Sequence, residues 1–99
     1  MKGNFDSIIQ SDKPVLVDFH AVWCQPCKVQ SPILQEVART LGEKVRIIKI
    51  DVDQNQSVAS RYRIQSVPTL ALFKNGQLLW KQSGVTPRDA LIQVINTHQ

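Results

Sequence analysis

Two cysteines are the side chains of this sequence best suited to covalent chemistry, and they lie three residues apart in Cys24-Gln25-Pro26-Cys27. Two intervening residues close too small a loop for a disulfide to constrain the unfolded chain much. A secreted chain of only 99 residues would more often carry several spaced disulfides. The pair is therefore better suited to thiol chemistry than to stabilising a fold.

A structural zinc site is one alternative for such a pair, because thiolates and imidazoles together supply the ligands of a tetrahedral site. Beyond the cysteines, the sequence offers only His20 and His98 as further ligands of this type, and it holds no second cysteine pair. His98 is expected in the last helix, near the chain end. The residues alone leave structural zinc and an unreactive pair open, but they favour thiol–disulfide exchange.

The elements predicted around the cysteines favour reactivity. A strand from Val15 to Ala21 leads into a helix that begins at Cys24 or Gln25 and ends at Leu41. The first N–H groups of a helix lack internal partners, so a thiolate at Cys24 would accept hydrogen bonds from them. We expect its pKa to fall below the roughly 8.5 of a free cysteine, helped by the charge of Lys28. Pro26 suits the first helical turn, where no backbone donor is lost.

The spacing places Cys27 near Cys24 within the first helical turn, and we expect it to be more deeply seated. A thiolate at Cys24 would attack a substrate disulfide and form a mixed disulfide. Cys27 would then attack Cys24, release the reduced substrate and close the local bridge. The sequence thus predicts a two-cysteine exchange mechanism with Cys24 as the nucleophile.

Strand-like and helix-like segments alternate along the chain, which predicts an α/β fold with a central mixed sheet and helices on both faces. Parallel strands come first and an antiparallel hairpin follows, in the approximate order βαβαββα. The hairpin is the clearest unit, because Asn75-Gly76 favours positive φ at both turn positions. The other expected elements are a helix at Asn4 to Gln10, a buried strand at Val45 to Val52, a helix at Ser57 to Tyr62, and hairpin strands at Thr69 to Lys74 and Gln77 to Gln82.

The first strand alternates in a way that predicts cover on both faces. Val15, Val17 and Phe19 share one face, and the other face carries Leu16, Asp18 and His20. Apolar residues on both faces are typical of a central strand. Asp18 is the exception that asks for an explanation, because a carboxylate is costly to bury among apolar neighbours.

Helical periodicity predicts the buried faces of the two longer helices. In the helix that follows the cysteines, apolar residues recur every four positions, at Val29, Ile33, Val37 and Leu41, widened by Leu34 and Ala38. Thr86 is expected to cap the final helix, with Pro87 at its first position and Asp89 reaching back to the cap. The expected buried face of that helix is Ala90, Leu91, Val94 and Ile95.

Composition limits the classes of function. The chain is long enough for one domain, residues 1–99, and 42% of its residues are hydrophobic. Its formal charge of +4 comes from scattered basic residues, which disfavours nucleic-acid binding. No apolar run approaches the roughly 20 residues that span a bilayer, and no secretory signal is apparent. We expect a soluble cytoplasmic monomer.

Residues 15–28, from Val15 through Trp23 and the cysteine pair to Lys28, resemble the active-site segment of the thioredoxin family. Pro32 lies where that family has its helix proline, and Val67-Pro68-Thr69 is similar to the loop whose proline is cis. Phe73-Lys74-Asn75-Gly76 resembles the family's hairpin, and Gly84 the glycine after it. The resemblance covers essentially the whole chain and implies the thioredoxin fold.

The resemblance also implies roles for individual residues. Cys24 corresponds to the attacking cysteine and Cys27 to the resolving one. Asp18 is similar to the buried carboxylate that exchanges a proton with Cys27, and Lys49 to the lysine near that carboxylate. The resemblance implies a docking surface on which an extended substrate segment would pair with the Val67 backbone as an added strand. This surface comprises Trp23, Gln25, Pro26, Val67 and Pro68.

The implied function is that of a protein-disulfide reductase in electron transport and cell redox homeostasis. It would bind no cofactor and would receive electrons from NADPH through a thioredoxin reductase or a similar donor. Its substrates would be proteins that contain disulfides. Three positions differ from the common pattern: Gln25 replaces a glycine, His20 an aromatic residue and Ser66 a glycine. Two alternatives therefore stay open, an oxidant or isomerase on the same fold and a non-catalytic interaction module.

Overall fold

A four-stranded mixed sheet forms the centre of the molecule, in the strand order β2-β1-β3-β4. The computed structural model describes residues 2–99. Strands β1 and β2 are parallel, whereas β3 pairs antiparallel with both β1 and β4. The predicted combination of a parallel pair with an antiparallel hairpin is confirmed. The strands are β1 (Val15–His20), β2 (Arg46–Asp51), β3 (Thr69–Lys74) and β4 (Gln77–Ser83).

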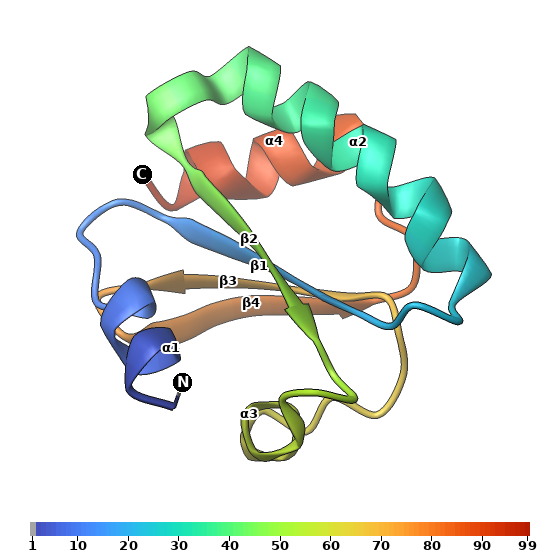
Figure 1. Cartoon of the computed structure of the whole chain (residues 1–99). Helices are drawn as coiled ribbons and strands as arrows, with labels where there is room; N and C mark the ends of the chain where they lie inside the picture. The colour runs from blue at the N-terminus through green and yellow to red at the C-terminus, as the bar shows by residue number, and fades with distance from the viewer. Residues whose placement is uncertain (1) are drawn as a thin grey trace.

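Helices cover both faces of this sheet, as the alternating pattern predicts (Figure 1). Helices α2 (Gln25–Leu41) and α4 (Arg88–Thr97) lie on one face, and α1 (Lys2–Ile9) and α3 (Gln56–Arg61) lie on the other. A short 3₁₀ turn, η1 (Gly42–Lys44), follows α2. Each face has its own apolar core.

Strand β1 runs through the middle of the molecule with the predicted alternation. Val15, Val17 and Phe19 belong to the core beneath α1 and α3, and Leu16 belongs to the core beneath α2 and α4. Asp18 and His20 follow Leu16 at steps of two, so they project to the α2 face. The strand therefore delivers a carboxyl and an imidazole to the side of the sheet on which the cysteine helix lies.

Strand β2 departs from the sequence prediction. The apolar run predicts a buried strand, but β2 lies at the edge of the sheet and its residues are exposed or half-buried. An edge strand has a neighbour on one side only, so its outer side meets solvent. Arg46 and Lys49, both exposed, mark this position. The remaining strand and helix boundaries agree with the prediction within two residues.

The buried stripe of α2 also differs from the prediction. Val29 is 56% exposed and Ala38 is exposed, whereas the buried positions are Cys27, Gln30, Leu34, Val37 and Leu41. A strict four-residue repeat drifts by about 40° per step around an α-helix, because each residue turns the helix by about 100°. The repeat from Val29 to Leu41 therefore leaves the core at its first residue. Pro32 lies inside the helix, on its exposed side.

The hairpin has the predicted turn, whereas the start of α4 does not have the predicted cap. Asn75 and Gly76 take φ values of 53° and 79°. Helix α4 begins at Arg88, so Pro87 is the N-cap residue and no side chain caps the helix. Thr86 lies one residue too early to cap, and its hydroxyl is buried without a hydrogen-bond partner in the described part of the chain. Leu91 and Ile95 are buried as predicted, but Ala90 is exposed.

Candidate active site

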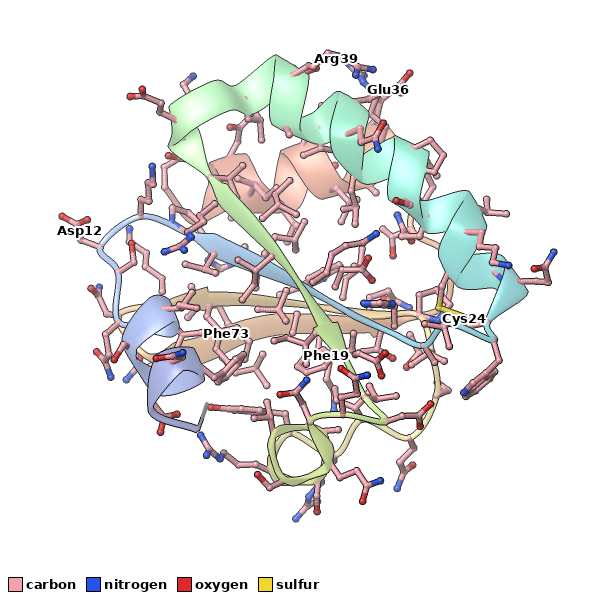
Figure 2. The ribbon with its side chains drawn as sticks, viewed as in Figure 1. Asp12, Phe19, Cys24, Glu36, Arg39 and Phe73 are labelled. Atoms are coloured by element: carbon pink, nitrogen blue, oxygen red, sulfur yellow. A yellow bond between two sulfur atoms is a disulfide. The ribbon has the colours of Figure 1, made fainter. Side chains whose placement is uncertain are left out.

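Cys24 and Cys27 form a disulfide at the N-terminus of α2, with their Cα atoms 5.3 Å apart. Cys24 is the N-cap residue, and the backbone N–H of Cys27 donates to its Sγ at 3.2 Å. Figure 2 shows the yellow sulfur pair at the end of the helix, where β1 leads into it. The predicted position of Cys24 at the helix terminus is confirmed. A thiolate formed there would keep this hydrogen bond and lie in the field of the helix dipole.

The expectation that Cys27 is the more deeply seated cysteine is wrong for this oxidised pair. Cys24 is 3% exposed and Cys27 is 6% exposed. Both pack with Ala21, against Val52 and Val67 from two other loops. These flanking side chains cover Cys24 from directions that the local sequence does not reveal. In the disulfide form, depth therefore does not distinguish Cys27 as the more protected cysteine.

Trp23 stands beside the disulfide with 67% of its surface exposed. Its indole Nε1 donates to Asp53 Oδ2 at 2.8 Å, which fixes the ring although it is open to solvent. Gln25 and Pro26, between the cysteines, are also exposed. An ordered aromatic ring and an exposed turn thus border the disulfide on one side.

The loop before β3 also borders the disulfide. The Val67–Pro68 peptide bond is cis, as the family resemblance implies. The Pro68 carbonyl accepts from the Gly84 N–H at 2.8 Å, which ties the loop to the end of β4. Within residues 2–99, the Val67 backbone makes no hydrogen bond, so its polar groups are available to a bound strand. A cavity of about 130 Å³ lies next to it, lined by Trp23, Val52, Ile64, Gln65, Ser66 and Val67.

Asp18 lies beneath the disulfide helix with no exposed surface. Neither carboxyl oxygen has a hydrogen-bond partner among the residues that the structure describes. Burial raises the pKa of Asp18, and the charges of His20 and Lys49 act in the opposite direction. The carboxyl is therefore biased towards holding a proton, as the sequence argument expects.

Lys49 is the cross-strand neighbour of Asp18 in the parallel pair of β1 and β2. Its Nζ donates to Ser31 Oγ at 3.1 Å, and among the described residues no ion pair with Asp18 forms. Lys49, His20 and Lys28 line one open cavity of about 480 Å³ together with Cys27, Ser31 and neighbouring residues. The structure thus gathers basic groups from three elements beside the resolving cysteine.

Three residues of this region escape the sequence analysis. Gln30 is fully buried, and its amide bonds the Thr86 backbone twice, accepting from N–H at 2.8 Å and donating to C=O at 3.0 Å. A polar residue at core spacing between Cys27 and Leu34 is the signal that could have found it. Asp53 and Ser31 leave no comparable signal, because each is an exposed or half-buried polar residue on a loop or helix.

The described residues include no group of three or more His, Cys, Asp or Glu side chains arranged to hold a metal ion. Between residues 2 and 99, no helix is both long and apolar enough to cross a membrane.

Comparison with known proteins identifies the family. The sequence profile of thioredoxin matches residues 1–97. Over 96 residues the chain is 46% identical to Thioredoxin Y, chloroplastic, of Oryza sativa, covering 96% of this chain and 57% of the rice protein. It is 44% identical over 97 residues to a thioredoxin of Haemophilus influenzae, covering 97% of this chain and 91% of that one.

Among solved structures, a mutant thioredoxin from Halobacterium salinarum superimposes with a TM-score of 0.88 at 35% identity, covering 97% of this chain and 83% of that chain. The sequence profile, the relatives and the shared fold agree with the geometry of the cysteine pair. The chain belongs to the thioredoxin family, whose members reduce protein disulfides by dithiol–disulfide exchange through a redox-active cysteine pair.

Proposed function

We propose that this thioredoxin-family reductase takes electrons from NADPH through a thioredoxin reductase, or a similar donor, and passes them to disulfides of partner proteins. The observation that carries this proposal is the hydrogen bond from the Cys27 N–H to Cys24 Sγ at the helix terminus. That bond stabilises a thiolate at the sulfur that must attack. The exposed Trp23 and the free Val67 backbone, among the residues that the structure describes, flank this sulfur and give a substrate segment a place to bind.

The first half-reaction joins the Cys24 sulfur to one sulfur of the substrate disulfide. The other substrate sulfur leaves with the electron pair and takes a proton from water. In the second half-reaction, Cys27 loses its proton and attacks the Cys24 sulfur of the mixed disulfide. The Cys24–Cys27 bond forms and the Cys24–substrate bond breaks, so the substrate leaves as a dithiol. The structure described here corresponds to the oxidised product of this reaction.

Asp18 is the proposed acceptor of the Cys27 proton. Burial without hydrogen-bond partners in the described part of the chain raises the pKa of Asp18, so its carboxylate is a stronger base than that of a solvated Asp and keeps the proton it accepts. Lys49 acts on this exchange through its charge, since its Nζ is bonded to Ser31. The two residues would therefore affect the resolution step more than the first attack.

Substrate docking is proposed for the surface formed by Trp23, Gln25, Pro26, Val67 and Pro68. An extended segment on either side of the substrate disulfide would pair with the Val67 backbone, as an added strand does at a sheet edge. The neighbouring cavity of about 130 Å³ has room for one small apolar side chain. Ser66, which lines this cavity, replaces the glycine common in the family. The set of partner segments that fit here should therefore differ from that of relatives with the glycine.

The proposed setting is the cytoplasm, with the chain acting as a single monomeric domain and without nucleic acid as a partner. The +4 charge is spread over the sequence, which supports contact with protein surfaces rather than with a phosphate backbone. The relatives include a bacterial thioredoxin and a chloroplastic one. Because these relatives come from such different settings, the electron donor is proposed as a thioredoxin reductase or a similar enzyme.

A coupled assay tests this function. Insulin, NADPH and a thioredoxin reductase are incubated with the protein, and NADPH oxidation is followed together with insulin precipitation. We expect turnover with the wild type and none with Cys24→Ser, because the attacking sulfur is missing. Cys27→Ser should instead accumulate a covalent adduct with insulin. Turnover that survives Cys24→Ser would contradict the mechanism.

The reduction potential separates the reductase from its alternatives. The potential is measured by equilibrating the protein with reduced and oxidised glutathione at known ratios. A low potential supports the reductase function, because the dithiol then donates electrons to ordinary protein disulfides. A strongly oxidising value would show that the chain is an oxidant or isomerase, with Gln25 as the residue to replace by Gly next. Binding of partners without any turnover would show an interaction module.

A further inference from the structure

The buried position of Asp18 creates a problem of proton exchange. In the role proposed above, on which this inference rests, Asp18 accepts a proton from Cys27 in every turnover. That proton must reach solvent before the next cycle, yet the Asp18 side chain has no exposed surface. A route out needs a group that can accept and release a proton near neutral pH.

His20 is the next side chain after Asp18 on the same face of β1. Unlike Asp18 it is half-buried, so it reaches solvent. It lines the cavity of about 480 Å³ that also contains Cys27. A water molecule fills about 30 Å³ of liquid, so this space admits several. This cavity thus connects His20 and the resolving cysteine with the surface, and Asp18, which does not line it, lies two residues before His20 on the same strand face.

The other charged groups that face His20 cannot take this role. Lys49 and Lys28 line the same cavity, but an ammonium has no lone pair and accepts no proton. Asp51 is the cross-strand neighbour of His20, and its Oδ1 accepts from the N–H groups of Asp53 and Gln54. These bonds occupy an oxygen of the Asp51 side chain, and a carboxylate is a weaker base than an imidazole. An imidazole alone exchanges a proton readily near neutral pH.

We propose that His20 receives, through an intervening water molecule, the proton that Asp18 takes from Cys27, and releases it to solvent. The Cys27 thiol first loses its proton to the Asp18 carboxylate, and the thiolate attacks Cys24. The disulfide closes, and the substrate sulfur leaves with its electron pair. Protonated Asp18 then passes its proton to a neutral His20 nitrogen. His20 releases this proton to cavity water, so both groups return to their starting states.

The resolution step can be observed alone with a chromogenic aromatic disulfide added in stoichiometric amount to the reduced protein. The first release of coloured thiolate reports attack by Cys24, and the second reports attack by Cys27. For the wild type, we expect the second rate to rise with pH, because only a neutral His20 can accept the proton. His20→Phe should lose this rise and resolve about tenfold more slowly at pH 7.5, a smaller loss than a full general base gives because water remains.

His20→Ala provides the sharper variant, because it opens space beside the cavity. Added imidazole should restore its second rate in proportion to concentration and leave the first rate unchanged. The matched control is His98→Ala, since His98 is the chain's only other histidine and follows the last helix. Its profile should superimpose on that of the wild type.

Asp18→Asn separates this inference from the proposed role of Asp18. It should slow resolution, and adding His20→Phe to it should cause no further loss, because both residues serve one path. The inference fails, and Asp18 keeps its role, if Asp18→Asn slows resolution but His20→Phe has the same pH profile as the wild type and added imidazole does not raise the second rate of His20→Ala. If neither variant slows resolution, both proposals fail.

Discussion

The buried amide of Gln30 offers a prediction whose size follows from the structure. In Gln30→Met the volume is nearly kept, but the hydrogen bonds to the Thr86 N–H and C=O are lost. Each buried backbone group left without a partner costs about 1–3 kcal/mol. The apolar side chain offsets about 1–2 kcal/mol of this cost through its own burial. With middle values for the two groups and for the offset, the expected net loss is about 2.5 kcal/mol of unfolding free energy.

Denaturant unfolding at equilibrium measures this loss as a shift of the midpoint at constant slope. The matched control is Gln35→Met, which changes an exposed glutamine on the same helix and should stay within about 0.5 kcal/mol of the wild type. A Gln30→Met protein as stable as the wild type would refute the reasoning, because Thr86 would then have found other partners at no cost.

The same substitution has a functional consequence. Thr86 lies two residues after Gly84, whose N–H holds the Pro68 carbonyl. Gln30 thus connects the cysteine helix with the loop proposed to bind substrate. Loosening this connection should raise the KM for insulin more than it lowers kcat, because docking is affected and the cysteines are not. If kcat fell by as large a factor as KM rose, the substitution would have shifted the helix terminus itself.

Three further predictions follow from the site. Asp18→Asn should stabilise the fold at neutral pH, because the raised pKa of Asp18 means that the folded state holds its proton longer than the unfolded state does as pH rises. As pH rises from near 4 to the folded-state pKa of Asp18, the unfolding free energy of the wild type should fall relative to that of this variant by up to about 1.36 kcal/mol per pH unit. Urea titrations at several pH values measure the difference, and a difference that stays constant with pH would contradict the prediction. Limited alkylation of the reduced protein, read by mass spectrometry, should label Cys24 faster than Cys27, and equal labelling would show that the Cys27 N–H does not favour the Cys24 thiolate. Asp53→Asn keeps an acceptor for the Trp23 indole N–H and should preserve the KM for insulin, whereas Asp53→Ala removes the acceptor and should raise that KM. The same KM for both variants would show that the Trp23 ring has no docking role.

Local sequence was sufficient for the features that depend on a few neighbouring residues. The place of Cys24 at a helix terminus, the Asn75-Gly76 turn and the alternation along β1 each follow from backbone preferences within one segment. Asp18 could be singled out for the same reason, since a carboxyl among apolar strand residues is unusual wherever the strand packs. The order of the elements predicts the mixed sheet, because each segment carries its own periodicity.

Contacts between distant segments decided the rest. Sequence periodicity placed Val29 in the core, but the packing of α2 on the sheet turned Gln30 inward, where Thr86 from 56 residues away satisfies its amide. Asp53 meets Trp23 across 30 residues, and Lys49 finds Ser31 across 18. Val52 and Val67 pack against the cluster of Ala21, Cys24 and Cys27, and in the disulfide form Cys24 is no more exposed than Cys27. Local preferences are set by each residue's own backbone, whereas burial and hydrogen-bond partners depend on which surfaces the folded chain brings together, and only the tertiary structure determines those.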